Sequence, residues 1–577
     1  MIRVFRPLFP HLRPHAKAFA WGFVALVYSV ALQLAGPQVL SRGVDAVASG
    51  SGSVPGLAAL LAGLALGQAG FRFASRRLVL AAARRVEHEL RMAYVGHLLR
   101  LPVETLDTAR RGDLVSRALH DIQDLRLFLG AGLLNLCQTV LVATATAVLL
   151  WRIHPGLTLV ALAPFPAIAW IVRRMSPRLH QRFLAADRAA GDLADRVHET
   201  LTAVRVLRAY RREAWQQARF QRENQALCTA RERVVWAWAG VFPAVGVLAG
   251  LGHVAVLGLG GYWVYEGSLS LGGLVAFSAY LAMLVWPMVA LGWTLSLFQR
   301  GAAAMGRLEE VRAWPAEPEP TGPLPRADGP CLEAEGVSYG YPGSRGPAVS
   351  GVDLRVPEGG VWALVGPTGS GKTTVVSLLA RLRRPQAGRI SVHGAPIHEV
   401  SDAALRRHLA VVPQEDFFFS DTVAANVCLG RPRDDAQIWD ALALAGLADD
   451  VAALLGGLDT PVGEGGVTLS GGQRQRLGIA RAVYGDPGVL VLDGSLSNLD
   501  ARTARAVIGR LRERFRGRTL LVVSHRAFEV EEADGVWFLA GGRVVAFGRH
   551  EDLWDELAAY RRLYREEALR RQLEEEP

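Results

Sequence analysis

The sequence predicts two parts, an α-helical polytopic membrane domain with six transmembrane helices and an α/β domain after it. Three observations predict this fold class. Six apolar stretches of membrane-crossing length lie in the first half of the chain, a proline-rich segment follows them, and the last part has the composition of an ordinary soluble α/β domain. At 577 residues the chain is also too long for a single compact core.

The apolar stretches satisfy the length rule for membrane helices, which need about 20 residues to cross the hydrocarbon. They lie at roughly 18–40, 55–75, 129–151, 155–172, 236–264 and 271–297. Only Arg152-Ile153-His154-Pro155 separates the third from the fourth, which predicts a short turn. The first stretch begins near Phe19 and has no small-residue cleavage site after it, so we do not expect a secretory signal peptide.

The net charge of +10 lies between the apolar stretches. Residues 1–330 contain 35 Lys and Arg against 21 Asp and Glu, whereas residues 331–577 contain 29 against 33. The segments 76–128 and 173–235 are rich in Arg, but the other loops contain only Arg42 and Arg152. Because cationic loops stay on the cytoplasmic side, we expect both long segments and both termini in the cytoplasm. The expected location is the inner (plasma) membrane of a bacterium, and the charge does not indicate a nucleic-acid partner.

The two Arg-rich segments have helical periodicity with charged faces. One interpretation is amphipathic helices lying on the membrane, but their length favours membrane helices that continue far into the cytosol. Residues 313–330 form a Pro-rich linker, which divides the chain into a membrane domain at 1–312 and a second domain at 331–577. The four cysteines have no zinc-site or disulfide spacing.

A phosphate-binding loop opens the second domain. Gly366-Pro-Thr-Gly-Ser-Gly-Lys-Thr-Thr374 lies between the predicted strand Val361–Val365 and a helical run from Val375, which is GxxxxGK[ST] in its strand–loop–helix context. Its backbone N–H groups and the helix N-terminus point at phosphate. Lys372 is predicted to reach the β- and γ-phosphates and the Thr373 hydroxyl to ligate Mg²⁺. The domain is therefore predicted to be an α/β P-loop ATPase domain with ATP and Mg as cofactors, held by Gly366, Pro367, Thr368, Gly369, Ser370, Gly371, Lys372, Thr373 and Thr374.

A second predicted buried strand, Val489–Asp493, ends in a carboxylate. Asp493 is predicted to hold Mg²⁺ through water, as the acidic residue does in other P-loop ATPases. An ordinary turn aspartate at the end of a strand is the alternative.

Leu469-Ser-Gly-Gly-Gln473, followed by Arg-Gln-Arg-Leu-Gly-Ile-Ala-Arg, closely resembles the signature motif of the ATP-binding cassette proteins. Ser-Gly-Gly before a helix is itself an amide-rich phosphate site. The resemblance implies that this motif caps the γ-phosphate of ATP held by a second cassette, so that two cassettes pair head to tail. The residues to which it assigns this role are Leu469, Ser470, Gly471, Gly472 and Gln473.

The resemblance covers about 331–565 and assigns roles to further residues. It implies that Tyr341 stacks on adenine, for which a core aromatic is the alternative. It also implies that Gln414 contacts Mg²⁺ and that His525 is a catalytic contact to the γ-phosphate. Thr460–Glu464 resembles an exporter-specific loop before the signature motif, and Ser497–Asp500 resembles the loop that crosses the dimer interface.

The membrane half resembles the exporters of this family as well. Leu101–Asp107 with Arg111–Arg117 resembles their first intracellular loop, and Glu199 with Val204–Tyr210 resembles the second. Six spans before one cassette is the arrangement of an exporter half-transporter. The resemblance therefore implies ATP-driven export of a substrate by alternating access, together with a second half-transporter.

The chain departs from the family at one catalytic position. The residue after the Walker-B aspartate is usually glutamate, the base that polarises the attacking water, and here it is Gly494. Losing a positioned base costs about 10² to 10⁴ in rate. We therefore expect a heterodimer whose partner retains the glutamate. Site one, with this chain's Lys372 and Asp493, would bind ATP and turn over slowly, whereas site two, with this chain's Ser470, Gly471 and Gly472, would hydrolyse it.

Three alternatives remain beside this hypothesis: a homodimeric exporter with slow hydrolysis, a non-transporting regulatory or receptor subunit, and a soluble ATPase acting on DNA. The six spans oppose the last of these. Membrane lipid is an expected partner, but the sequence does not identify the transported substrate. Polar groups in the spans fit either a cavity or contacts between helices, and they include Gln33, Gln38, Gln68, Asn135 and Gln138.

Overall fold

The structure is a computed structural model that describes residues 2–50, 54–325, 329–344, 346–463, 466, 468–524 and 526–565. The chain forms two compact units. The helical unit comprises Met1–Arg100 and Arg110–Pro315, and the α/β unit comprises Leu101–Ala109 and Ala316–Pro577. The short stretch Leu101–Ala109 therefore belongs to the α/β unit, although it lies far from the rest of that unit in the sequence.

The helical unit contains, within the described residues, six helices long and apolar enough to cross a membrane, as the sequence predicted. They run over Val4–Ala48, Val54–Leu98, Arg111–Ile153, Pro155–Met175, Glu213–Tyr265 and Leu271–Arg312. The main elements in these spans are α2 (Ala16–Ala48), α3 (Val54–Leu98), α7 (Leu133–Ile153), α8 (Pro155–Leu162), α9 (Phe165–Thr202), α11 (Glu213–Tyr265) and α12 (Leu271–Arg312).

Several of these helices are much longer than a bilayer requires. At 1.5 Å per residue, the 45 residues of α3 span about 68 Å and the 53 residues of α11 about 80 Å, against a hydrocarbon core of about 30 Å. The membrane helices therefore continue beyond the hydrocarbon, as the Arg-rich segments 76–128 and 173–235 predicted.

The third span is continuous, but it contains two π-helical turns. It runs through α5 (Arg111–Ser116), a π turn at Arg117–Asp121, α6 (Ile122–Leu127), a second π turn at Phe128–Gly132, and α7. The predicted turn follows α7. His154 has an extended backbone there, and its Nδ1 accepts a hydrogen bond of 3.0 Å from the Leu157 N–H, which caps α8.

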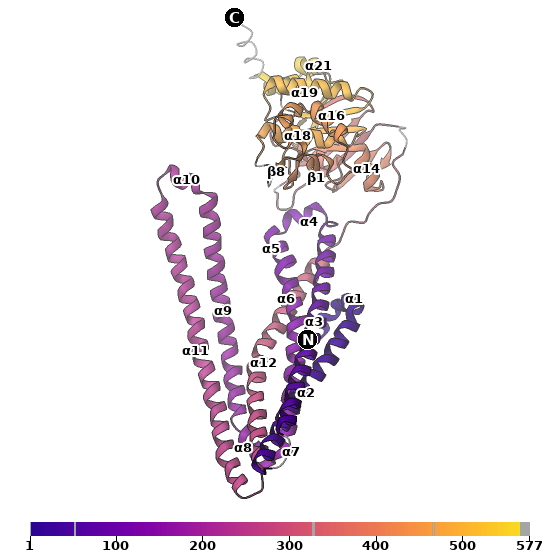
Figure 1. Cartoon of the computed structure of the whole chain (residues 1–577). Coiled ribbons are helices and arrows are strands. Elements are labelled where there is room, and N and C mark those ends of the chain that lie inside the picture. The colour runs from indigo at the N-terminus through magenta and orange to yellow at the C-terminus, as the bar shows by residue number, and fades with distance from the viewer. Residues whose placement is uncertain are drawn as a thin grey trace. The chain divides into compact units, whose positions relative to one another are not determined.

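Helices α9 and α11 pair along their length and form an arm whose tip is α10 (Val204–Ala209; Figure 1). An ion pair of 2.7 Å between Arg196 and Glu223 joins the two helices. Apolar side chains at the tip are exposed, with Val206 at 59% and Tyr210 at 74%. Among the described residues, the tip of this arm therefore exposes apolar side chains.

The α/β unit is built on a six-stranded sheet with the strand order β12-β11-β3-β10-β9-β6. All neighbours in it are parallel except β11 and β12. Its strands are β3 (Gly360–Val365), β6 (Leu409–Val412), β9 (Val489–Asp493), β10 (Thr519–Ser524), β11 (Gly535–Ala540) and β12 (Arg543–Gly548). An antiparallel sheet of β2 (Val349–Val356), β1 (Leu332–Tyr339), β4 (Ala387–Val392) and β5 (Ala395–Pro396) accompanies it, and β7 (Asp421–Thr422) pairs with β8 (Pro461–Val462).

The helices of this unit are α4 (Val103–Thr108), α13 (Lys372–Leu379), α14 (Asp402–His408), α15 (Val423–Cys428), α16 (Asp435–Leu444), α17 (Ala448–Ala452), α18 (Gly471–Tyr484), α19 (Ala501–Arg514), α20 (Ala527–Val530) and α21 (His550–Glu556). The central strands β9 and β10 are buried along their whole length, which is typical of a parallel sheet covered on both faces. In the register, Val365 of β3 pairs with Ser524 of β10, and Asp493 of β9 pairs with Val523. The segments after β3, β9 and β10 therefore leave the sheet at the same edge, where parallel sheets bind their ligands.

Candidate nucleotide site

The phosphate loop, residues 366–374, leaves β3 and enters α13 as the sequence predicted. Two of its glycines are required by close approaches of the backbone. A Cβ on Gly366 would overlap the backbone oxygen of Leu539, and a Cβ on Gly371, which has φ +101°, would lie 2.6 Å from the backbone oxygen of Ala348. The loop is thus packed against neighbouring backbone and presents its N–H groups from a fixed frame.

Lys372 is buried at the start of α13, with its ammonium group turned into the loop. Nζ donates to the carbonyl oxygens of Gly366 at 2.8 Å and of Pro367 at 3.0 Å. Burial lowers the pKa of this lysine, and the neighbouring Asp493 opposes that shift. The positive charge of Lys372 therefore lies within the phosphate loop, where it would contact a bound phosphate.

The residues predicted to hold Mg²⁺ come together around the end of β9. Burial raises the pKa of the Asp493 carboxyl, while a hydrogen bond from Thr373 and the charge of Lys372 lower it. The Cγ of Gln414 lies 3.6 Å from where a Cβ on Gly494 would stand, so Gln414 borders the same site. A hydroxyl, a carboxylate and an amide oxygen are hard donors that suit Mg²⁺ when phosphates and water complete its shell. Within the described residues no cluster of three or more His, Cys, Asp and Glu side chains suits a metal ion.

Tyr341 lies beside the phosphate loop rather than in the core. Its hydroxyl is 3.2 Å from Oγ1 of Thr374, and its side chain is 38% exposed. The guanidinium of Arg383 lies 4.8 Å from the centre of its ring. An exposed aromatic ring next to a phosphate loop can stack on a nucleotide base, as the resemblance implies.

The signature motif, residues 469–473, forms the N-terminus of α18. A capping box closes it, because Ser470 Oγ accepts from the Gln473 N–H at 3.2 Å and Gln473 Oε1 accepts from the Ser470 N–H at 2.9 Å. Gln473 Nε2 also donates to Asp450 at 2.9 Å. Gln473 is therefore occupied in holding the cap, and Gly471 and Gly472 form the first residues of α18, an amide-rich helix N-terminus that suits a phosphate.

Gly494 begins a tight turn after β9. Its backbone has φ +60°, its N–H donates to the carbonyl oxygen of Val523 at 3.0 Å, and its own carbonyl oxygen accepts from the Ser497 N–H at 3.1 Å. An added Cβ would meet only Gln414, at an ordinary contact distance. Glycine is thus favoured here by the left-handed backbone and not by lack of room.

No other carboxylate of this turn replaces the missing glutamate. Asp500 accepts a hydrogen bond of 3.0 Å from the Thr503 N–H and caps α19. That hydrogen bond lowers the pKa of Asp500, which makes the carboxylate a poor proton acceptor. Asp500 is therefore a helix cap, consistent with its expected place in the interface loop, residues 497–500.

Sequence reasoning missed two residues that hold the interface loop. Gln475 is buried at 4% exposure, and its amide donates to Ser497 Oγ at 3.1 Å and accepts from the Asn498 N–H at 2.9 Å. Arg526 donates to the carbonyl oxygens of Ser497 at 2.8 Å and of Leu499 at 3.0 Å. Because Gln475 lies on α18, it connects the signature motif to the interface loop. His525 and Glu464, two residues of the predicted site, lie outside the described residues.

A third missed residue, Arg383, connects α4 to the aromatic site. Arg383 forms an ion pair of 2.5 Å with Asp107 of α4, and its other Nη donates to the Tyr339 hydroxyl at 3.1 Å. Glu104 of α4 also accepts a hydrogen bond of 3.4 Å from the Arg384 N–H. The guanidinium that touches Asp107 is the one that lies against Tyr341.

Comparisons with known proteins agree with this arrangement. Residues 19–288 match the family described as ABC transporter transmembrane region, and residues 349–497 match the family described as ABC transporter. The multidrug resistance-like ATP-binding protein MdlA of Escherichia coli (strain K12) is 33% identical over 582 residues, which cover 100% of this chain and 98% of that protein. The ATP-dependent lipid A-core flippase of Cupriavidus metallidurans is 33% identical, with 96% and 94% covered.

A solved structure is similar over almost the whole chain. It is described as a bacterial Atm1-family ABC exporter with ATP bound. The TM-score is 0.79 at 26% sequence identity, and the match covers 96% of this chain and 98% of that one.

Proposed function

The chain belongs to the ATP-binding cassette (ABC) transporter family, as a half-transporter with its membrane domain fused to one nucleotide-binding domain. From this premise we propose that it is the half of an asymmetric ATP-driven exporter that hydrolyses its own ATP slowly. One observation carries the proposal: Gly494 stands where a catalytic carboxylate is expected, in a cassette whose other described motifs are intact. Among the described residues around the turn, Asp500 is occupied as a helix cap and Asp493 borders the Mg²⁺ site.

Site one holds ATP on this chain's phosphate loop, with Tyr341 against the base and Thr373, Gln414 and Asp493 around Mg²⁺. Mg²⁺ supplies charge neutralisation of the phosphates when it is bound. Without a base at position 494 the attacking water keeps its proton, and turnover falls by about 10² to 10⁴. This site therefore acts mainly as a clamp, which ATP binding closes.

Site two uses the partner's phosphate loop and the signature motif of this chain. The capping box of Ser470 and Gln473 aligns the first N–H groups of α18, and Gln475 holds the interface loop beside them. Preorganised amides of this kind stabilise charge on a phosphate without reorganising during the reaction. An intact signature motif in a chain without its own base fits a role in catalysis on the partner's ATP.

Nucleotide binding in site one reaches the membrane domain through α4. Arg383 lies against the ring proposed to hold adenine and pairs with Asp107. A base stacked on Tyr341 therefore alters the surroundings of Arg383. The ion pair of Arg383 with Asp107 anchors α4, which lies between α3 and α5 in the sequence. The exposed apolar tip around α10, in turn, is a surface for the partner half-transporter.

We propose that the chain lies in the inner membrane of a bacterium, with both termini and the long helical extensions in the cytoplasm. The Arg-rich extensions support this orientation. The transported substrate is proposed to be an amphiphile, because the similar proteins include one named for multidrug resistance and one named for lipid A-core flipping.

The pairing is tested by recovering the chain from its native membrane and identifying the half-transporter that accompanies it. We expect a second chain whose residue after the Walker-B aspartate is glutamate. In the purified complex, Ser470→Arg should lower ATPase activity at least about tenfold, because it blocks site two. Lys372→Ala in the same chain is the matched control, and it should lower the activity less. Recovery of this chain alone, or a larger effect of Lys372→Ala, would contradict the proposal.

A further inference from the structure

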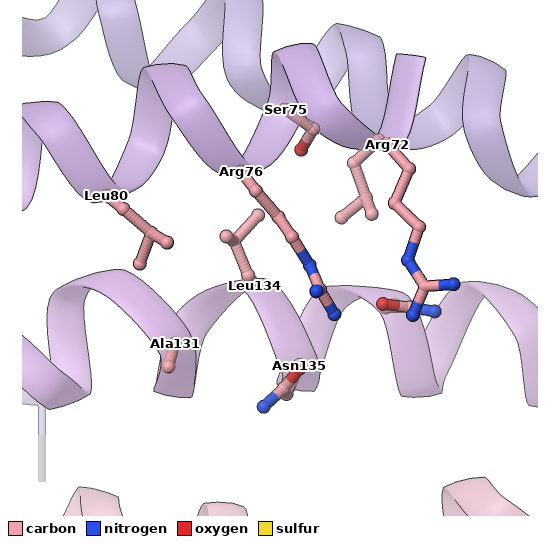
Figure 2. A pocket seen from close by; sticks show the side chains of 9 residues that line it. Arg72, Ser75, Arg76, Leu80, Ala131, Leu134 and Asn135 are labelled. Atoms are coloured by element: carbon pink, nitrogen blue, oxygen red, sulfur yellow. The ribbon is translucent and has the colours of Figure 1, made fainter. Parts of the chain in front are cut away.

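A cavity of about 230 Å³ lies between α2, α3 and the start of the third span's α7, inside the helical unit. Its polar lining comes from two helices: Arg72, Ser75 and Arg76 from α3, and Asn135 and Gln138 from α7. Figure 2 shows Arg72 and Arg76 one helical turn apart, both extending from α3 toward the facing helix. The site is polar and cationic, although it is built from membrane helices.

The depth of the cavity follows from the length of α3. Helix α3 begins at Val54, and at 1.5 Å per residue Arg72 lies about 27 Å and Arg76 about 33 Å along it. The hydrocarbon core of a bilayer is about 30 Å thick. Both guanidinium groups therefore stand where α3 leaves the hydrocarbon, on the side of the Arg-rich extensions, at the level of the cytoplasmic headgroups.

The polar groups of this cavity have no partners among the described residues. No ion pair or hydrogen bond joins Arg72 or Arg76 to any residue that the structure describes, although Arg91 and Arg126 of the neighbouring surfaces both pair with Glu87. Two like charges four residues apart on a helix repel each other. An anion between them would remove that repulsion.

The buried hydroxyl of Ser75 is a second, independent indication. Ser75 is 1% exposed, lines the cavity, and its Oγ has no hydrogen-bond partner. Buried polar groups are almost always hydrogen-bonded, so an exception beside two unpaired cations indicates a missing acceptor. Snorkelling explains how an arginine near a membrane surface reaches water, but it does not explain a buried hydroxyl between the two arginines in the sequence.

We propose that this cavity binds the phosphate of an anionic amphiphile from the cytoplasmic leaflet. The forked guanidinium groups of Arg72 and Arg76 hold the phosphate oxygens, and the Ser75 hydroxyl donates to one of them. The amides of Asn135 and Gln138 bind the hydroxyl groups of the head. Basic pockets between membrane helices at the cytoplasmic side are suited to such heads. The site requires only the membrane domain and does not depend on the asymmetric pairing of the cassettes.

The test is a binding titration of the purified, delipidated full chain. Dihexanoyl phosphatidylglycerol, added below its micelle concentration, should bind saturably and at least about tenfold more tightly than dihexanoyl phosphatidylcholine or inorganic phosphate. Arg72→Gln with Arg76→Gln should weaken the binding at least about tenfold. The double variant Arg77→Gln with Arg84→Gln removes the same charge from exposed positions of α3 outside the cavity, and it should bind like the unaltered chain.

A second variant keeps both arginines, so the test remains valid if the double variant does not fold. Asn135→Trp fills the cavity from α7 and should also weaken binding of phosphatidylglycerol. Native mass spectrometry should show less co-purified anionic lipid in both cavity variants than in the control. Equal binding of phosphatidylcholine, or an equal loss in the Arg77 and Arg84 control, would overturn the proposal. Tight binding of inorganic phosphate that depends on Arg72 and Arg76 would overturn the lipid as its ligand.

Discussion

Restoring a carboxylate at position 494 is a sharp test of what the glycine does. An added side chain has room, because its Cβ would meet only Gln414 Cγ, at 3.6 Å. The backbone is the obstacle, since φ is +60° and a residue with a Cβ pays about 1–2 kcal/mol in that region. For a domain of this size the loss corresponds to a fall of about 2–8 °C in the Tm of the cassette.

The two nucleotide sites of the complex set an upper limit on how much Gly494→Glu can raise the ATPase rate. If site two already hydrolyses ATP, a fully restored site one raises the ATPase rate of the complex by no more than about twofold. Gly494→Gln is the matched control, because it has the same strain and nearly the same volume without a base. We therefore expect equal losses in Tm for both variants and a gain of about twofold or less for glutamate over glutamine.

The assays are differential scanning fluorimetry of the complex and steady-state release of phosphate. A gain of about tenfold or more for Gly494→Glu would mean that neither site hydrolyses in the unaltered complex, which contradicts the asymmetric assignment. An unchanged Tm in both variants would refute the strain at this turn.

Further predictions concern nucleotide binding, topology and coupling. Lys372→Ala should abolish binding of a fluorescent ATP analogue at site one, because it removes the ammonium group from the phosphate loop; unchanged affinity at that site would contradict the assignment. Protease sites inserted at 100–120 and 205–225 should be cut from the cytoplasmic side, and sites near 45–53 and 265–269 from the other side; external cleavage at 205–225 would overturn the orientation. Asp107→Asn should leave ATP affinity within about twofold and lower the coupling of ATP hydrolysis to transport in vesicles, because it breaks the ion pair with Arg383. Glu309→Gln, which breaks the ion pair of Glu309 with Arg312, is the control, and unchanged coupling in Asp107→Asn would show that the pair with Arg383 is only structural.

Much of the fold follows from patterns in the sequence. The six spans, the turn at His154 and the strand–loop–helix of the phosphate site each depend on local length, capping or glycine placement, and the structure has them where they were expected. The two π turns of the third span were not predicted: the first, Arg117–Asp121, contains no Gly or Pro, and in the second, Phe128–Gly132, the two glycines lie at the start of an apolar stretch that was expected to be a continuous helix.

The contacts within the site were less predictable. Gln475 stands in an Arg-Gln-Arg run that resembles a solvated helix face, but α18 turns this glutamine inward to the interface loop. Arg383 lies in a run of arginines, and its two partners come from β1 and from α4, far away in the sequence. Such contacts depend on which segments the fold brings together, which local patterns do not determine. The left-handed backbone at Gly494 was likewise not predicted, because the sequence shows only that the glutamate side chain is missing at this position.

The central claim, that this chain does not hydrolyse its own ATP efficiently, is tested most directly by purifying the chain alone and measuring its ATPase rate. Lys372→Ala serves as the background, because it removes activity that depends on this chain's phosphate loop. We predict a rate at least about 10²-fold below that of the complex with its partner, since no base stands at position 494. If the chain alone hydrolyses ATP at the rate of the complex, and Lys372→Ala abolishes that activity, Gly494 is not disabling and the asymmetric assignment is wrong.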